Sequence, residues 1–469
     1  MPPKPAKSKK DKKNDKKKKK QTGAAVDASK LLKELIKEYD VRCDVYCAAP
    51  CLPLRRQLRT FQEESKVLHR FLIDPKDRRK VEYWEDDDLP GQFAPIDILS
   101  ELKKKPKKKG KKEHQNLVKV LPLLEALRNK RYIHIQELFV WEVMMAYDDI
   151  CALSAMIARS IYQFVRIELV DCFLDSKCLE KLIPSINACR TLQEINLDFN
   201  EFGDEGCRTI CTGLTGNRWL LQLSMCYCDL SKTSGLYLGE LVAKTPIREI
   251  YLDGNELKAE GVILLLNQLC QGAEQEAQER LEQKLLKEEQ EAAVAAASDT
   301  RPRYNIDEFE PTSEITSENA TVDTQAPPAK AGKKGKKKNK RKKSKKPKKK
   351  SKSFMAPPPP VGPQIEKIRV ADNGIDQMGR GGNFAPMRCM QLFKTIIANA
   401  KDLEDIDLFG NDIGDLGSRQ LLEGLILRKA NKLPQIGIRV GHRINQDTFD
   451  LITKLAPGAK KKKRGKAKK

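Results

Sequence analysis

Aliphatic residues recur at a fixed spacing in the middle of the chain. The pattern Leu192-x-x-Ile195-x-Leu197-x-x-Asn200 returns 28 residues later with Cys at the ninth position, and 27 residues after that with Asn. Polar residues, Glu194, Asn196 and Asp198 in the first of these copies, alternate with the aliphatic residues at the fourth and sixth positions of the motif. Successive side chains of a strand point to opposite faces, so this alternation predicts a short strand with one apolar face.

Further copies with the same spacing flank the three central ones, and the outermost copies are degraded. They begin at Ile135, Phe164, Ile365, Leu403 and Leu433. Terminal repeats are expected to be atypical, because they cap the core against water. A single match to this pattern would be weak evidence, whereas several copies in phase indicate a repeat architecture.

Each repeat continues from its strand into a helix. Gly203 and Gly206 suit the turn into that helix, and Ile210 and Leu214 supply its apolar side. A buried Asn200 would bond backbone groups of neighbouring repeats that otherwise lack partners. Cys is small enough for the same place. One unit cannot bury its apolar face alone, so we expect the units to stack.

The motif and its period resemble the ribonuclease-inhibitor-like superfamily of leucine-rich repeats over residues 133–272 and 363–457. The resemblance implies an α/β fold, a leucine-rich-repeat solenoid or horseshoe with parallel strands on the concave face and helices outside. A charged interruption separates the two stretches. Loop-closure entropy grows only logarithmically, so we expect aliphatic residues from both flanks to share one core.

Composition divides the rest of the chain. Segments dense in lysine cannot bury enough apolar surface to fold, so we expect them to be disordered. The predicted parts are a basic tail (1–23), a partly helical region of unassigned fold (24–113), the first half of the repeats with a helical cap (114–272), an insertion with a charged helix and a polybasic, Pro-rich linker (273–362), the second half (363–457) and a basic tail (458–469).

Helices are predicted over residues 24–39 and 114–130, and three cysteines follow the first of them. Cys43, Cys47 and Cys51 could ligate zinc, but they form no C-x-x-C pair and no His is near, so separate structural thiols are the favoured interpretation. Most other cysteines fall at core positions. The chain opens on lysines rather than an apolar signal and contains no run of about 18 apolar residues, so we expect reduced thiols and no membrane span.

The net charge of +24 is unevenly distributed. Four basic blocks together carry +41, which leaves −17 on the remainder. Such blocks could bind nucleic acid, anionic lipid or an acidic protein surface such as the tubulin tails, or could act in nuclear import or solubility. Few aromatic residues are interleaved to favour nucleic acid. Candidate polyanion-binding residues are Lys16, Lys17, Lys18, Lys336, Lys337, Lys338, Arg341, Lys461 and Arg464.

No catalytic arrangement is present in the sequence. The four histidines lie in no H-E-x-x-H or triad-like setting, and no G-x-x-x-x-G-K-[ST] loop occurs. We therefore predict a protein without enzymatic activity, cofactor or metal. The concave face is the candidate binding surface for a protein, with acidic groups at matching positions of several repeats and two aromatic anchors. Its candidate residues are Glu194, Asn196, Asp198, Glu249, Tyr251, Asp253, Arg369, Asp405, Asp407 and Phe409.

The layout of a lysine-rich start, a repeat domain and a long charged insertion is similar to that of leucine-rich-repeat proteins of cilia and flagella. That resemblance implies a non-catalytic scaffold or adaptor of an axonemal complex in the cytoplasm, with basic arms on microtubules. The alternative is a nuclear or nucleolar protein whose tails bind RNA. The superfamily also includes the GTPase activator of Ran, which implies a GTPase regulator as a third hypothesis. That activator ends in an acidic tail, whereas this chain ends in lysines.

Overall fold

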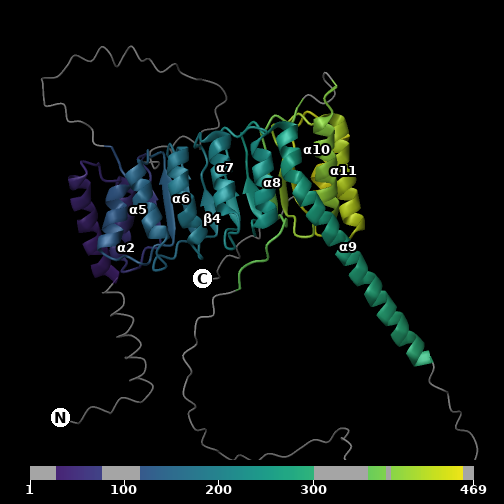
Figure 1. Cartoon of the computed structure of the whole chain (residues 1–469), viewed down its shortest axis with the longest axis horizontal. Helices are drawn as coiled ribbons and strands as arrows, with labels where there is room; N and C mark the ends of the chain where they lie inside the picture. Colours follow the sequence, from purple (N-terminus) through teal and green to yellow (C-terminus); the bar gives the residue numbers. More distant parts are fainter. Residues whose placement is uncertain (1–27, 77–116, 300–356, 377–381, 458–469) are drawn as a thin grey trace, which may run out of the picture. The chain divides into compact units, whose positions relative to one another are not determined.

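The repeats form one parallel sheet covered by helices. The computed structural model describes residues 28–76, 117–299, 357–376 and 382–457. Figure 1 shows the helices lying over one face of the sheet. Nine strands follow one another in chain order. They are β1 (Arg70–Ile73), β2 (Glu137–Trp141), β3 (Arg166–Val170), β4 (Glu194–Asn196), β5 (Gln222–Ser224), β6 (Glu249–Tyr251), β7 (Lys367–Arg369), β8 (Asp405–Asp407) and β9 (Gly437–Arg439).

Helices alternate with these strands. An unlabelled helix spans residues 28–45. The others are α2 (Leu52–Glu63), α4 (Leu121–Asn129), α5 (Tyr147–Ile157), α6 (Ser176–Ala188), α7 (Gly203–Leu214), α8 (Ser234–Lys244), α9 (Lys258–Asp299), α10 (Ala385–Asn399), α11 (Gly414–Ala430) and α12 (Gln446–Leu455). This order confirms the predicted α/β leucine-rich-repeat fold.

The aliphatic positions of the motif form the core. Ile195 and Leu197 are buried beneath the sheet, and Ile210 and Leu214 of α7 are buried against them. Each removes apolar area from water, which stabilises the stack by about 25 cal/mol per Å². Gly203 enters α7 with a φ of +61°, a backbone conformation that glycine adopts without strain.

The ninth position joins each repeat to its neighbour. Asn200 Oδ1 accepts hydrogen bonds from the backbone N–H groups of Cys172 and Leu174 at 3.0 and 3.1 Å. Its Nδ2 donates to the carbonyls of Leu169 and Leu197, both at 2.8 Å. The predicted role of a buried asparagine is therefore confirmed. At the equivalent place the thiol of Cys228 donates to the Leu197 carbonyl at 3.3 Å.

The two stretches of repeats share one core across the insertion. Strand β6 pairs with β7, so that Ile250 lies opposite Ile368. The helices of the same two repeats also touch, because the Cys270 thiol donates to the Leu392 carbonyl at 3.2 Å. Described residues up to Leu281 and from Pro358 belong to one compact unit. The expectation of a continuous interior is thus confirmed.

The sheet begins earlier in the chain than the sequence motif suggested. Strand β1 pairs with β2, and its Phe71 and Ile73 are fully buried. Leu68, Phe71 and Ile73 follow the repeat spacing, but Lys76 stands at the ninth position, so this copy escaped recognition. The helix predicted over 24–39 is present from residue 28, where the described residues begin, and it continues to residue 45.

The helix predicted over 114–130 is shorter in the structure, where α4 spans Leu121–Asn129. Residues 114–116 lie outside the described residues, and Val118 forms a bridge with Ala49 rather than part of a helix. Pro122 then suits the first turn of α4, where a backbone N–H would have no partner within the helix.

All thirteen cysteines are free thiols. Cys172, Cys189, Cys211, Cys228 and Cys270 are buried, as their core positions predicted. Of the three cysteines near the start, Cys43 and Cys51 are buried and Cys47 is exposed, and the Cys51 thiol donates to the Asp74 carbonyl at 3.4 Å.

Several predictions fall on residues that the structure does not describe. The basic tails 1–23 and 458–469 and most of the polybasic linker lie outside the described residues, with all nine candidate polyanion-binding residues. Among the described helices, none combines the length and apolar character that a bilayer crossing requires.

Candidate functional site on the strand face

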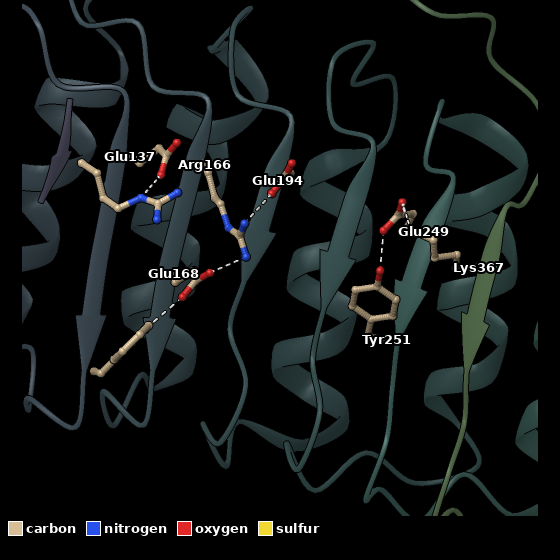
Figure 2. A network of polar contacts seen from close by, with 9 residues as sticks. Glu137, Arg166, Glu168, Glu194, Glu249, Tyr251 and Lys367 are labelled. Atoms are coloured by element: carbon tan, nitrogen blue, oxygen red, sulfur yellow. Dashed lines mark hydrogen bonds and ion pairs between the residues drawn. The ribbon is translucent and has the colours of Figure 1, made fainter. Parts of the chain in front are cut away.

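The side of the sheet opposite the helices is the strand face. We define it by the outward side chains of β1–β9 and of the residues that follow each strand. Figure 2 shows that these side chains reach across neighbouring strands in a network of polar contacts. The register of the parallel strands places equivalent residues next to one another, such as Glu194 beside Arg166.

Around Arg166 the network joins four strands, β1 to β4. The guanidinium lies 2.6 Å from Glu168 and 3.2 Å from Glu194. The indole N–H of Trp141 donates to the other oxygen of Glu168 at 3.0 Å. The ring of Phe139 lies beneath two guanidinium groups, with Arg70 at 5.1 Å and Arg166 at 5.5 Å from its centre. Cation–π contact and charge pairing therefore act on the same arginines.

A second group forms on β6–β8, across the insertion. Glu249 pairs with Lys367 at 2.7 Å and accepts a hydrogen bond from the hydroxyl of Tyr251. Arg369 lies over the Tyr251 ring at 4.9 Å, and its guanidinium is 3.9 Å from Asp405. Burial, and then the bond to Glu249, raise the pKa of Tyr251. The phenol therefore stays protonated at neutral pH.

A third group closes the far end of the strand face. Arg439 lies over the Phe409 ring at 4.3 Å and pairs with Asp407 at 3.2 Å. Asp407 also accepts a hydrogen bond from the Phe409 backbone N–H at 3.0 Å. The structure thus brings Asp407 and Phe409 together around an arginine from the next strand.

Two of the predicted acidic residues support the backbone of the next repeat. Asp198 accepts hydrogen bonds from the Cys226 N–H at 2.8 Å and the Ser224 hydroxyl at 2.6 Å. Asp253 accepts the Ala371 N–H at 2.9 Å, and burial raises its pKa. Within its own repeat, the Asn196 side chain accepts a hydrogen bond from the Asp198 N–H at 2.8 Å.

The predicted acidic groups of the strand face are therefore not all unpaired charges. Five of its carboxylates lie within ion-pair distance of an arginine or lysine from an adjacent strand, namely Glu137, Glu194, Glu249, Asp405 and Asp407. Ion pairs on an exposed surface contribute about 0–1 kcal/mol each, so their main effect here is to orient the side chains. The result is a patterned surface of fixed charges and half-exposed rings.

Sequence reasoning missed an aromatic hollow at the carboxyl ends of β2–β4. Its volume is about 470 Å³, and its walls include Trp141, Glu168, Asp171, Asp198 and Phe199. The alternation in β2 would have placed Phe139 and Trp141 on the strand face. Phe199 lies at the eighth position of the motif, for which the motif specifies no residue type.

Comparisons with known proteins agree with this architecture. A leucine-rich-repeat family model matches residues 188–211 and 400–418. The mouse ribonuclease inhibitor is 31% identical over 114 residues, which cover 24% of each chain. The mouse NACHT, LRR and PYD domains-containing proteins 4E and 4C are each 28% identical over 99 residues, or 21% of this chain and 10% of theirs. This chain thus matches about a quarter or less of each relative.

The repeat spacing, the parallel sheet and these matches define one class of protein. The repeats are leucine-rich repeats of the ribonuclease-inhibitor-like superfamily. Arrays of this class present extended binding surfaces. Arginine and aromatic side chains, such as those fixed on the strand face, are enriched among the residues that dominate protein interfaces.

Proposed function

We propose that this protein is a non-catalytic scaffold whose strand face binds another protein. The continuous strand face, on which arginines are held over aromatic rings, carries the proposal. Side chains already fixed by ion pairs lose less conformational entropy when a partner binds. The name of one relative, ribonuclease inhibitor, also describes a protein that acts on another protein.

Site-specific cross-linking tests this proposal. A photoreactive amino acid at Gln222, on the strand face, should yield a discrete cross-linked partner in the cells that express the protein. The same group at Glu240, exposed on α8, serves as the matched control. Loss of the product on Tyr251→Ala and Arg369→Ala, but not on Lys244→Ala, is the expected result. Equal labelling from Gln222 and Glu240 would contradict the proposal.

We further propose that the protein belongs to a cilium or flagellum, where its lysine blocks bind the acidic tails of tubulin. The block at 330–352 carries +16 without an acidic residue. Bare lysines with few aromatic residues favour charge attraction to an acidic polymer over stacking on nucleic-acid bases. RNA binding is the competing outcome.

Co-sedimentation distinguishes these outcomes. The full chain should pellet with microtubules, and removal of the tubulin tails should abolish most of that binding. Rising salt should weaken it, because exposed charges are screened within about 10 Å at 0.1 M ionic strength. Indifference to tail removal, together with equal or tighter binding to RNA of matched charge, would overturn the microtubule assignment.

A further inference from the structure

The residue before the ninth motif position has a left-handed backbone in repeat after repeat. Glycine and asparagine adopt this conformation readily, whereas aromatic residues rarely do, and then at a cost in free energy. The positions and their φ values are Glu142 (55°), Asp171 (52°), Phe199 (59°), Tyr227 (54°), Gly254 (69°), Asp372 (52°) and Gly410 (78°). Phe199 and Tyr227 therefore have a backbone conformation that is unfavourable for aromatic residues.

Phe199 and Tyr227 form an exposed platform. Their rings are stacked with centres 4.8 Å apart and planes 6° from parallel. A Cβ built on Gly254 would meet the Tyr227 ring at 2.1 Å, so the ring covers that glycine. Phe199 and Tyr227 are nevertheless 50% and 46% exposed. A strained and exposed pair of rings contributes little to the core, so the pair is a candidate for contact with a binding partner.

The platform borders the 470 Å³ hollow, which is rich in carboxylates. Glu168 is paired with Arg166, and Glu142 with Lys76. Asp171 and Asp198 have no basic partner among the described residues. Asp198 is held in place by the Ser224 hydroxyl and the Cys226 N–H. Two carboxylates, one of them held in place, therefore line the hollow beside Phe199 with no cation among the described residues.

Elsewhere on the strand face the chain itself supplies that cation. Phe139, Tyr251 and Phe409 each lie beneath an arginine. Each of these arginines is within ion-pair distance of a carboxylate. Among the described residues, no basic group lies over Phe199 or Tyr227. The same combination of ring and carboxylate is thus present there without its arginine.

We propose that this hollow binds an arginine side chain of the protein partner. The guanidinium would stack on the Phe199 ring, which Tyr227 supports from its other side, and pair with Asp171 and Asp198. Arginine fits better than lysine, because its planar group both stacks on rings and bonds carboxylates in a fixed geometry. This inference rests on the proposed protein-binding function and specifies what the partner presents.

Selection of peptides on the full-length protein tests the inference. Random peptides of about twelve residues, displayed on phage at about 0.15 M salt to limit nonspecific attraction, should be enriched for a shared arginine. Replacing that arginine with citrulline, which keeps the shape but not the charge, should weaken binding at least about tenfold. Replacing the arginine with lysine, which keeps the charge, should weaken binding less than citrulline does.

Phe199→Gly and Asp171→Asn should each weaken the selected peptides by about fivefold or more. Glycine suits the φ of +59°, so the Phe199→Gly protein should keep its Tm within about 3 °C. Phe173→Gly is the matched control, because Phe173 is also exposed (70%) with a φ of 55° but does not line the hollow. It should leave binding unchanged.

Binding that tolerates citrulline or Phe199→Gly would overturn the arginine site. If those peptides instead lose affinity on Tyr251→Ala, the strand face still binds protein and only the arginine site fails. If no selected peptide responds to any strand-face variant, both proposals fail.

Discussion

Asn200 and Cys228 occupy the same motif position but satisfy the backbone differently. The asparagine side chain both accepts and donates, so it joins the repeat before it to its own strand. The Cys228 thiol donates to carbonyls of Leu197 and Cys226, both at 3.3 Å. In the repeat before Cys228, the Phe202 N–H, which is equivalent to the Leu174 N–H, bonds the backbone carbonyl of Asn200 at 2.8 Å rather than a side chain of the next repeat. The two residue types are therefore not energetically equivalent.

We expect Asn200→Ala to lower the free energy of unfolding by about 2–4 kcal/mol, because two buried N–H groups lose their acceptor. Cys228→Ala should cost about 1 kcal/mol, since it removes weak thiol bonds and little volume. Urea denaturation of the two variants measures the difference. Gln193→Ala, an exposed change just before β4, is the control and should lie close to the parent protein. Equal losses at 200 and 228 would contradict this account.

At the scale of elements, a carboxylate links the start of α7 to the turn before α8. Asp204 accepts hydrogen bonds from the Ser231 N–H at 2.9 Å and from the Ser231 and Ser234 hydroxyls at 2.5 Å. Burial raises the pKa of Asp204, but the hydroxyl hydrogen bonds outweigh it and bring the pKa down to about 2. Folding therefore favours the ionised form.

Asp204→Asn should lower stability by about 1 kcal/mol at pH 7, a figure reduced for partial exposure to solvent. The folded pKa is below the unfolded value of 3.8, so this contribution is complete above about pH 4. It is lost as pH falls toward 2. Thermal unfolding from pH 7 to pH 2 should thus show the two proteins converging in acid. Glu205→Gln, an exposed change in the same helical turn, should show no comparable convergence.

At the scale of the whole molecule, pairing of β6 with β7 means that the insertion interrupts the chain but not the core. Arg280 donates to the Asn399 carbonyl at 2.5 Å, so α9 still contacts α10 close to the point where the compact unit ends at Leu281. α9 continues to Asp299, and its Leu285, Leu286 and Val294 are exposed.

Replacing residues 300–356 with a Gly/Ser linker of about fifteen residues should change stability by only about 1 kcal/mol, because closure entropy depends weakly on loop length. Tryptophan fluorescence and circular dichroism should report one coincident unfolding transition. Peptide binding at the strand face should persist, whereas microtubule binding should fall with the lost lysines. Two separate transitions would show that the halves fold independently.

The aliphatic spacing and the buried asparagines were predictable because they depend on local periodicity. The spacing alone was enough to expect β6 beside β7. Of the described strands only β1 was missed, since its copy at Leu68 stands 67 residues before the next one at Ile135 and has Lys76 at the ninth position. Contacts between residues far apart in the chain were not predictable.

Arg428 lies in the last turn of α11, where a basic side chain is usually exposed to solvent, yet it is only 2% exposed. Its guanidinium donates to the carbonyls of Ile397 and Ala400 at 2.9 and 2.7 Å.

The sequence by itself determined the repeat, its strand-then-helix unit and its apolar interior, because each depends on residues close together in the chain. Only the tertiary structure decided which charges meet. Lys367 and Glu249 are 118 residues apart and are neighbours only through the register of two strands. The same register brings Asp171, Asp198 and Phe199 to one hollow that has no cation among the described residues, which no count of residue types would reveal.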